Sequence, residues 1–348
     1  MLGSSAVFVL GLLAAAAPAA ARSDTPAPDL LRRMAGTWDA TMQVASVGDE
    51  PPLVINGTEV STLGGDGVWL VSDFRSQIEG RPFQGHGLLA RDPRTGRYRR
   101  VWADSTSPVF WSSEGTYDGA TDSLTLWIET SDSEGHPVRW REVVTWKNDD
   151  LRTFTMFVPG PETREAAGVS IVYRRRKDPG GLTPATGPVL SPASGPPYAI
   201  LARAGGTWKA AVDDRTDTTR GRAVSKGIET GALCCDGQFL VTDLAGSGRG
   251  RSFTAHGLLG YDPQRKKYVR AWIDSIERTL TVTEGDYDAA GNTLTLRVPQ
   301  SDGQQGAIAR REVLGWKGPD ERFLKVLVPN AEGQESPGRT IEYRRVRE

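Results

Sequence analysis

Four side chains that alternate along one short segment could form a binding site. Tyr98, Arg100, Trp102 and Asp104 are spaced two residues apart. Successive side chains of a β-strand point to opposite faces, so these four share one face of the predicted strand. An arginine could bind an anionic group, and a tryptophan could stack on a flat one. The same residue types recur at the same spacing as Tyr268, Arg270, Trp272 and Asp274.

The sequence leaves open which way this face points. If it points into a barrel, the lumen is polar and aromatic. If it points outward, it is a solvated face on which the apolar parts of the long side chains lie along the surface and their polar ends reach water. The side that carries Val101 and Ala103 then forms the core. We favour the inward direction, because both copies keep the same four side chains. Alternatively, Arg100 pairs with Asp104 or a neighbouring glutamate and only holds the sheet together.

Two further shared polar positions complete the candidate ligand-binding set: His86, Glu114, His256 and Glu284. A histidine on a strand is more often a hydrogen-bonded structural residue than a ligand or base. Three histidines divided between two repeats do not suit a conventional zinc site. Haem held by one proximal histidine, either His86 or His256, is the weaker alternative.

Acid–base chemistry would need polar side chains that converge in a cavity. The hypothesis that the protein is an enzyme therefore predicts that two or more of Asp73, Arg100, Asp104 and Glu114, or their counterparts, lie within hydrogen-bond reach of one another around an open cavity. The chain has no Gly-x-Ser-x-Gly elbow, phosphate-binding loop or His-Glu-x-x-His motif. We assign no catalytic residue, metal ligand or cofactor; the sequence leaves enzymatic activity uncertain, and we lean against it.

The elements that would position these side chains occur twice. Segments 83–105 and 253–275 align without a gap, and the same offset of 170 residues relates Trp38 to Trp208 and Trp146 to Trp316. Two units of ordinary domain size follow. We place them at residues 29–176 and 198–348, joined by a linker rich in Pro and Gly at 177–197.

Inside each unit the hydrophobic pattern has period two, and turn signals such as Asp92-Pro93 and Asp262-Pro263 separate the runs. The sequence predicts an all-β protein with two tandem antiparallel barrels of about eight to ten strands, each preceded by a short helix. Closing a sheet into a barrel removes the unpaired edges that an open sheet would expose.

Gly257-Leu-Leu-Gly-Tyr-Asp-Pro263, Trp272-Ile-Asp-Ser275, Glu284-Gly-Asp-Tyr-Asp288 and the opening Gly-Thr-Trp resemble the bacterial domain of unknown function 1579. The resemblance covers nearly all of both units, and the second unit matches more closely than the first. It implies lipocalin-like barrels of the calycin type that are often exported, and it supplies no catalytic residues.

Residues 1–21 carry an apolar run at 6–17 followed by small residues, which predicts a cleaved signal peptide. We therefore expect a bacterial protein that is periplasmic or secreted, with no integral membrane span in the mature chain.

The net charge of −1 gives no electrostatic case for binding nucleic acid. The adjacent Cys234 and Cys235 replace Gly64 and Gly65 of the first repeat, so we read them as small turn residues.

Three functions remain open. The first is a binding module that holds a small apolar or amphipathic molecule in one or both barrels, in a cavity of several hundred Å³ lined by Trp102 or Trp272. The second is a non-catalytic envelope or interaction protein with packed barrels, whose protein partners the sequence does not indicate. The third is an enzyme with an Arg, Asp, Glu or His site in the lumen. We favour the first.

Overall fold

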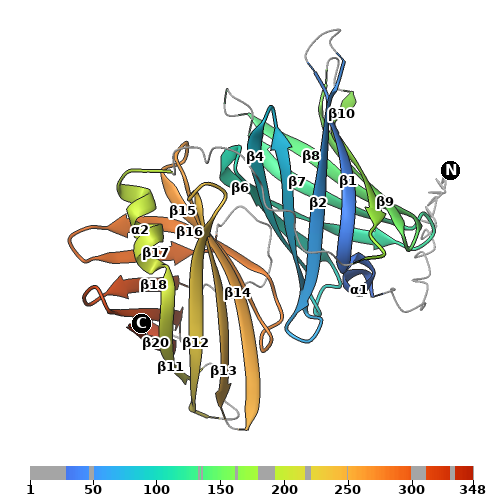
Figure 1. Ribbon diagram of the computed structural model, residues 1–348. Helices are drawn as coiled ribbons and strands as arrows, with labels where there is room; N and C mark the ends of the chain where they lie inside the picture. The colour runs from blue at the N-terminus through green and yellow to red at the C-terminus, as the bar shows by residue number, and fades with distance from the viewer. Residues whose placement is uncertain are drawn as a thin grey trace, which may run out of the picture.

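The computed structural model describes residues 29–46, 51–131, 134, 136–160, 164–178, 193–215, 221–248, 250–298, 311–329 and 334–347. Figure 1 shows two β-barrels side by side, each with a short helix at its start. The predicted signal peptide and residues 179–192 of the predicted linker lie outside the described residues. No helix among the described residues is long and apolar enough to cross a membrane.

The first barrel is a closed antiparallel meander in which β1 pairs with both β2 and β10. Its elements are α1 (Leu30–Met34), β1 (Gly36–Val44), β2 (Leu53–Gly64), β3 (Trp69–Ile78), β4 (Arg81–Arg91), β5 (Tyr98–Asp104), β6 (Ser107–Asp118), β7 (Ser123–Ser131), β8 (Pro137–Asn148), β9 (Leu151–Pro159) and β10 (Glu165–Arg175).

The second barrel closes in the same way, with β11 paired to β12 and β20. Its elements are α2 (Pro196–Ala204), β11 (Gly206–Asp214), β12 (Ala223–Cys234), β13 (Phe239–Gly248), β14 (Arg251–Asp262), β15 (Lys267–Asp274), β16 (Thr281–Asp288), β17 (Thr293–Arg297), β18 (Arg311–Trp316), β19 (Glu321–Pro329) and β20 (Glu335–Arg345). The predicted fold, two tandem antiparallel barrels each preceded by a short helix, is confirmed.

The Gly-Thr-Trp motif and the last strand together fasten each helix to its barrel. The indole N–H of Trp38 donates to the Met34 carbonyl at 2.9 Å, at the end of α1. Arg175 donates to two further carbonyls there, both at 2.7 Å, and its guanidinium lies 4.2 Å from the centre of the Trp38 ring. Trp208 and Arg345 repeat these contacts in the second barrel.

The helix closes one end of the first barrel. Its apolar side chains pack with buried residues of five strands. The cluster comprises Leu30, Leu31, Met34, Leu70, Leu89, Tyr98, Leu124, Leu126, Val144 and Trp146. This end of the lumen is therefore mainly apolar.

A second apolar cluster joins the two barrels to each other. It takes outward-facing side chains from β4 and β5 together with their counterparts on β14 and β15, and the rings of Phe110 and Phe239 meet across it at 6.4 Å. Val101 and Ala103 have no exposed surface. Both faces of β5 are therefore buried, one in the lumen and the other against the second barrel.

Candidate functional site

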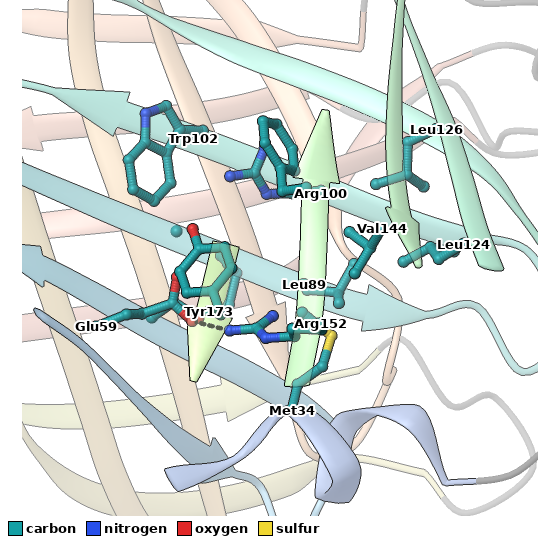
Figure 2. Close-up of a pocket in the computed structure, with 14 residues that line it drawn as sticks. Met34, Glu59, Leu89, Arg100, Trp102, Leu124, Leu126, Val144, Arg152 and Tyr173 are labelled. Carbon is teal, nitrogen blue, oxygen red and sulfur yellow. Dashed lines mark hydrogen bonds and ion pairs between the residues drawn. The ribbon is translucent and has the colours of Figure 1, made fainter. Parts of the chain in front are cut away.

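The face of β5 that carries Tyr98, Arg100, Trp102 and Asp104 points into the first barrel. Strand pairing places Trp102 opposite Gly87 and Arg100 opposite Leu89, and directly opposed residues share a face. Figure 2 shows Arg100 and Trp102 around a pocket inside the barrel. The inward direction that we favoured is the one that the structure shows.

The enclosed pocket is small. Its volume is ≈ 30 Å³, which is room for about one or two water molecules. We expected a cavity of several hundred Å³ beside Trp102, so that size was wrong for the enclosed part of the lumen. The lining comprises Met34, Glu59, Ser72, Gly87, Leu88, Leu89, Arg100, Trp102, Leu124, Leu126, Val144, Arg152, Phe154 and Tyr173.

Two buried ion pairs cross this lumen. Arg100 donates to Glu142 at 2.6 Å, and the second carboxylate oxygen of Glu142 accepts from Ser113 at 2.7 Å. Arg152 donates to Glu59, the pair marked by a dashed line in Figure 2. The alternative in which Arg100 pairs with a glutamate is thus confirmed. The charges of the two pairs cancel, so the middle of the lumen is electrically neutral.

Two aromatic rings pack against the guanidinium of Arg100. Its guanidinium lies 4.9 Å from the Trp102 ring centre and 5.4 Å from that of Phe154. The Trp102 N–H donates to Asp104 at 3.0 Å, toward the end of the barrel opposite α1. Tyr98 lies at the helix end, where burial raises the pKa of its hydroxyl. The four predicted residues therefore follow the lumen from its closed end to its open end.

The open end carries two tryptophans that we did not select from the sequence. Trp111 lies directly opposite Trp102, and Trp140 lies opposite Ile128, whose side chain is buried. The rings of Trp111 and Trp140 pack in a tilted arrangement, with their centres 4.8 Å apart and their planes at 36°. All three tryptophans face the lumen and yet remain only half-buried. Water therefore reaches an aromatic lumen wall at this end.

The second barrel is closed at the equivalent end. Trp272 is buried there, and Arg339 donates to Asp214 at 2.7 Å. Arg339 also lies 3.1 Å from Glu277 and 3.5 Å from Asp274. The first barrel has uncharged residues where this cluster has Arg339, Asp214 and Glu277, namely Val169, Val44 and Ser107.

The other predicted site residues lie outside both lumens. Glu114 pairs with Arg97 at 2.5 Å on the outside of the first barrel, and Glu284 pairs with Arg265. His86 and His256 face out of their barrels and meet at the interface. Among the hydrogen bonds of the described residues, none joins two of the four groups that the enzyme hypothesis required, Asp73, Arg100, Asp104 and Glu114.

The sequence carried a signal for part of what we missed. Glu59 and Arg152 recur as Glu229 and Arg322 at the common offset, and these residues form the same buried pair in the second barrel. Trp111 and Trp140 have no such counterpart, since position 281 is a threonine and position 310 an arginine. Comparing the repeats where they differ would have pointed to the open end of the first barrel.

Residues 25–175 and 193–345 each match the family described as "Protein of unknown function (DUF1579)". The chain belongs to this family. The resemblance to this family seen in the sequence is therefore confirmed over both repeats. A comparison with curated proteins finds no match.

Solved structures with a similar shape include three distant proteins. The S-type phycobiliprotein lyase CPES from Guillardia theta is 13% identical, covers 43% of this chain and 92% of its own, with a TM-score of 0.30. Rv2717c from M. tuberculosis is 17% identical over 43% and 99%, with a TM-score of 0.34. A DUF3598 protein of unknown function from Nostoc punctiforme is 12% identical over 91% and 98%, with a TM-score of 0.24. Similarities this weak carry no argument about the function of this DUF1579 protein.

Proposed function

We propose that this protein is an exported binding protein that holds a small apolar or amphipathic molecule at the open end of its first barrel. The observation that carries the proposal is the exposure of Trp102, Trp111 and Trp140. Their rings face the lumen and are still half-open to water. Covering such rings with a ligand removes apolar surface from water, which favours binding.

The divergence of the two repeats supports the same site. A duplicated scaffold that served only as a packed support could keep both ends alike. Here the second barrel fills the equivalent end with the charged cluster around Arg339. The first barrel keeps Val169 in that place and adds Trp111 and Trp140. The second barrel then acts as a packed support that covers the outside of β5.

The enclosed pocket of ≈ 30 Å³ is too small for a whole ligand. The body of the molecule would therefore lie among the tryptophans, and only one end would reach the pocket beside Arg100. The proposal that the protein is exported rests on the apolar segment at residues 6–17. It predicts that the mature protein is recovered from the periplasm or medium without residues 1–21.

Trp140→Ala is expected to weaken binding of the neutral fluorescent probe N-phenyl-1-naphthylamine by about tenfold, because a large lumen-facing ring is lost. The measurement is a titration followed through the emission of the probe. Trp127→Ala is the matched control. Trp127 lies on the outer face of the same barrel, stacked under Arg139 at 4.0 Å, so its loss should leave the affinity unchanged.

Equal losses in the two variants, or no saturable binding by the wild-type protein, would contradict the proposed site. Circular dichroism of each variant checks that the barrel is intact.

A further inference from the structure

Within the part of the chain that the structure describes, Arg100 keeps hydrogen-bonding capacity at the point where the open end meets the enclosed pocket. A guanidinium carries five N–H groups, and Arg100 donates one of them to Glu142. Its side chain keeps 21% of its surface exposed, against 4% for Glu142. The rings of Trp102 and Phe154 pack against the guanidinium. The remaining donors are therefore pre-positioned for a ligand group.

The charges around Arg100 determine what that group can be. Glu142 already neutralises Arg100, and Glu59 neutralises Arg152. The Asp104 carboxylate, held by the Trp102 N–H, adds a negative charge toward the open end. An anionic ligand would bring a buried charge, and both described lumen cations, Arg100 and Arg152, are already paired, so its burial is costly. A cationic ligand would face Arg100 itself.

We propose that the inner end of the ligand is a compact, uncharged hydrogen-bond acceptor, such as a hydroxyl or carbonyl oxygen, received by Arg100. This inference rests on the proposed binding function and specifies its ligand class. A group of one or two heavy atoms fits the ≈ 30 Å³ pocket. The flat or apolar remainder of the ligand then lies against the tryptophans.

Isothermal titration calorimetry with three probes that share one ring system tests the charge preference. The probes are 1-naphthalenemethanol, 1-naphthoate and 1-naphthylmethylammonium. We expect the neutral alcohol to bind about tenfold more tightly than either ion. The double variant Arg100→Met/Glu142→Gln should lose this preference, and Arg270→Met/Glu312→Gln in the second barrel should keep it.

If an ion binds as tightly as the alcohol, the ligand class is wrong and the binding function stands. If none of the three binds, the binding function itself fails. The comparison of probes uses the wild-type protein, so it does not depend on the folding of a variant.

A separate chain of four side chains crosses the interface between the barrels. The Nδ1 atoms of His86 and His256 lie 2.9 Å and 2.8 Å from carboxylate oxygens of Asp73 and Asp243. The two Nε2 atoms face each other at 3.1 Å. Both imidazoles are buried, with 5% and 3% of their surface exposed. Their contacts must therefore be satisfied within the protein.

Counting protons shows which charge state satisfies the chain. A neutral imidazole has one N–H, and if both rings donate it to their aspartates, two lone pairs face each other at the centre. One extra proton on the pair gives the centre a donor and an acceptor, so every contact becomes a hydrogen bond. A second extra proton places two N–H groups opposite each other.

We infer that His86 and His256 share one extra proton when the barrels are docked, and that docking is most stable at the pH where the pair carries that single proton. Arg75 on β3, the thiols of Cys234 and Cys235 and, through Cys235, Asp104 also act on the chain. Replacement of either histidine by glutamine removes the shared proton and keeps a polar side chain.

If the two rings share one proton, one ring should hold its proton more tightly than an ordinary histidine and the other less tightly. The pKa values of His86 and His256 differ in this way. Burial lowers the pKa of both rings. At His86 the hydrogen bond to Asp73 and nearby charges outweigh burial, so its pKa lies above the ordinary 6.5. At His256 burial prevails, and its pKa lies below 6.5. The stability from His86 is lost as pH rises through its raised pKa, and the His256 contribution is lost as pH falls below 6.5.

Thermal unfolding of the wild type, His86→Gln and His256→Gln between about pH 5.5 and about pH 8.5 tests the inference. We expect the wild-type midpoint to peak near pH 6.5 and to fall by about 2–4 °C on each side. Each glutamine variant should show a flatter profile. A peak that survives in both variants would overturn the shared proton.

Nitrogen-15 NMR of the ring nitrogens in the wild-type protein gives a direct readout. The variant His136→Gln leaves only the two interface rings. One ring should titrate above its ordinary pKa and the other below it. Simultaneous titration of both rings at one pH would also overturn the inference.

Discussion

Replacing Arg152 by methionine is expected to lower the free energy of unfolding of the first barrel by about 3–5 kcal/mol. Arg152 is 2% exposed and lies between the rings of Trp38 and Tyr173, at 4.5 Å and 4.3 Å from their centres. Its removal leaves the Glu59 carboxylate buried without a cation. Breaking one partner of a buried pair therefore costs more than the net value of the pair.

The double variant Arg152→Met/Glu59→Gln is the control for this prediction. It removes the buried charge as well as the cation, so it should recover most of the lost stability. Chemical denaturation followed by circular dichroism measures each variant. A double variant no more stable than Arg152→Met would show that the cost comes from lost packing against Trp38 and not from the uncompensated carboxylate.

The repeat made most of the fold predictable from the sequence. A gap-free offset fixed two units, and period two with Asp-Pro turns fixed antiparallel strands. The Gly-Thr-Trp motif marked the entry into each barrel, where Trp38 and Trp208 are fully buried. These features are local or repeated, so they leave a direct trace in the residue pattern.

The orientation of β5 could not be read from the sequence, for a physical reason. Alternation shows which residues share a face, and an apolar face is normally taken as the buried one. Here Val101 and Ala103 are buried against the second barrel, while Arg100 and Trp102 line the lumen. Both faces of this strand are buried, one apolar and one polar and aromatic, so a rule that assumes a single buried face cannot assign its orientation.

The contact between His86 and His256 was equally out of reach. Each histidine was considered within its own repeat, because nothing in the pattern states that equivalent surfaces of the two units meet. The available signal was the apolar outer face of the same hairpin in both copies, including Leu88 and Leu258. An apolar face that the lumen does not use favours a partner surface.

Replacing Leu258 by aspartate is expected to separate the two barrels while each keeps its strands. Leu258 is 1% exposed within the apolar cluster that joins them. Losing the leucine contact costs about 1.5–3 kcal/mol, and burying an unpaired carboxylate adds several more. Undocking exposes the aspartate to water and avoids that cost, so the separated arrangement becomes the favoured one.

Small-angle X-ray scattering measures this outcome as an increase in the radius of gyration, with an unchanged β-sheet circular dichroism spectrum. Leu88→Asp, the equivalent change on the first barrel, should have the same effect, because Leu88 is also 1% exposed in the cluster. Lys226→Asp on the exposed side of β12 is the control and should leave the radius unchanged. Undocking would also uncover the outer face of β5, so a weaker affinity for the lumen probe in Leu258→Asp would show that the second barrel supports the site in the first.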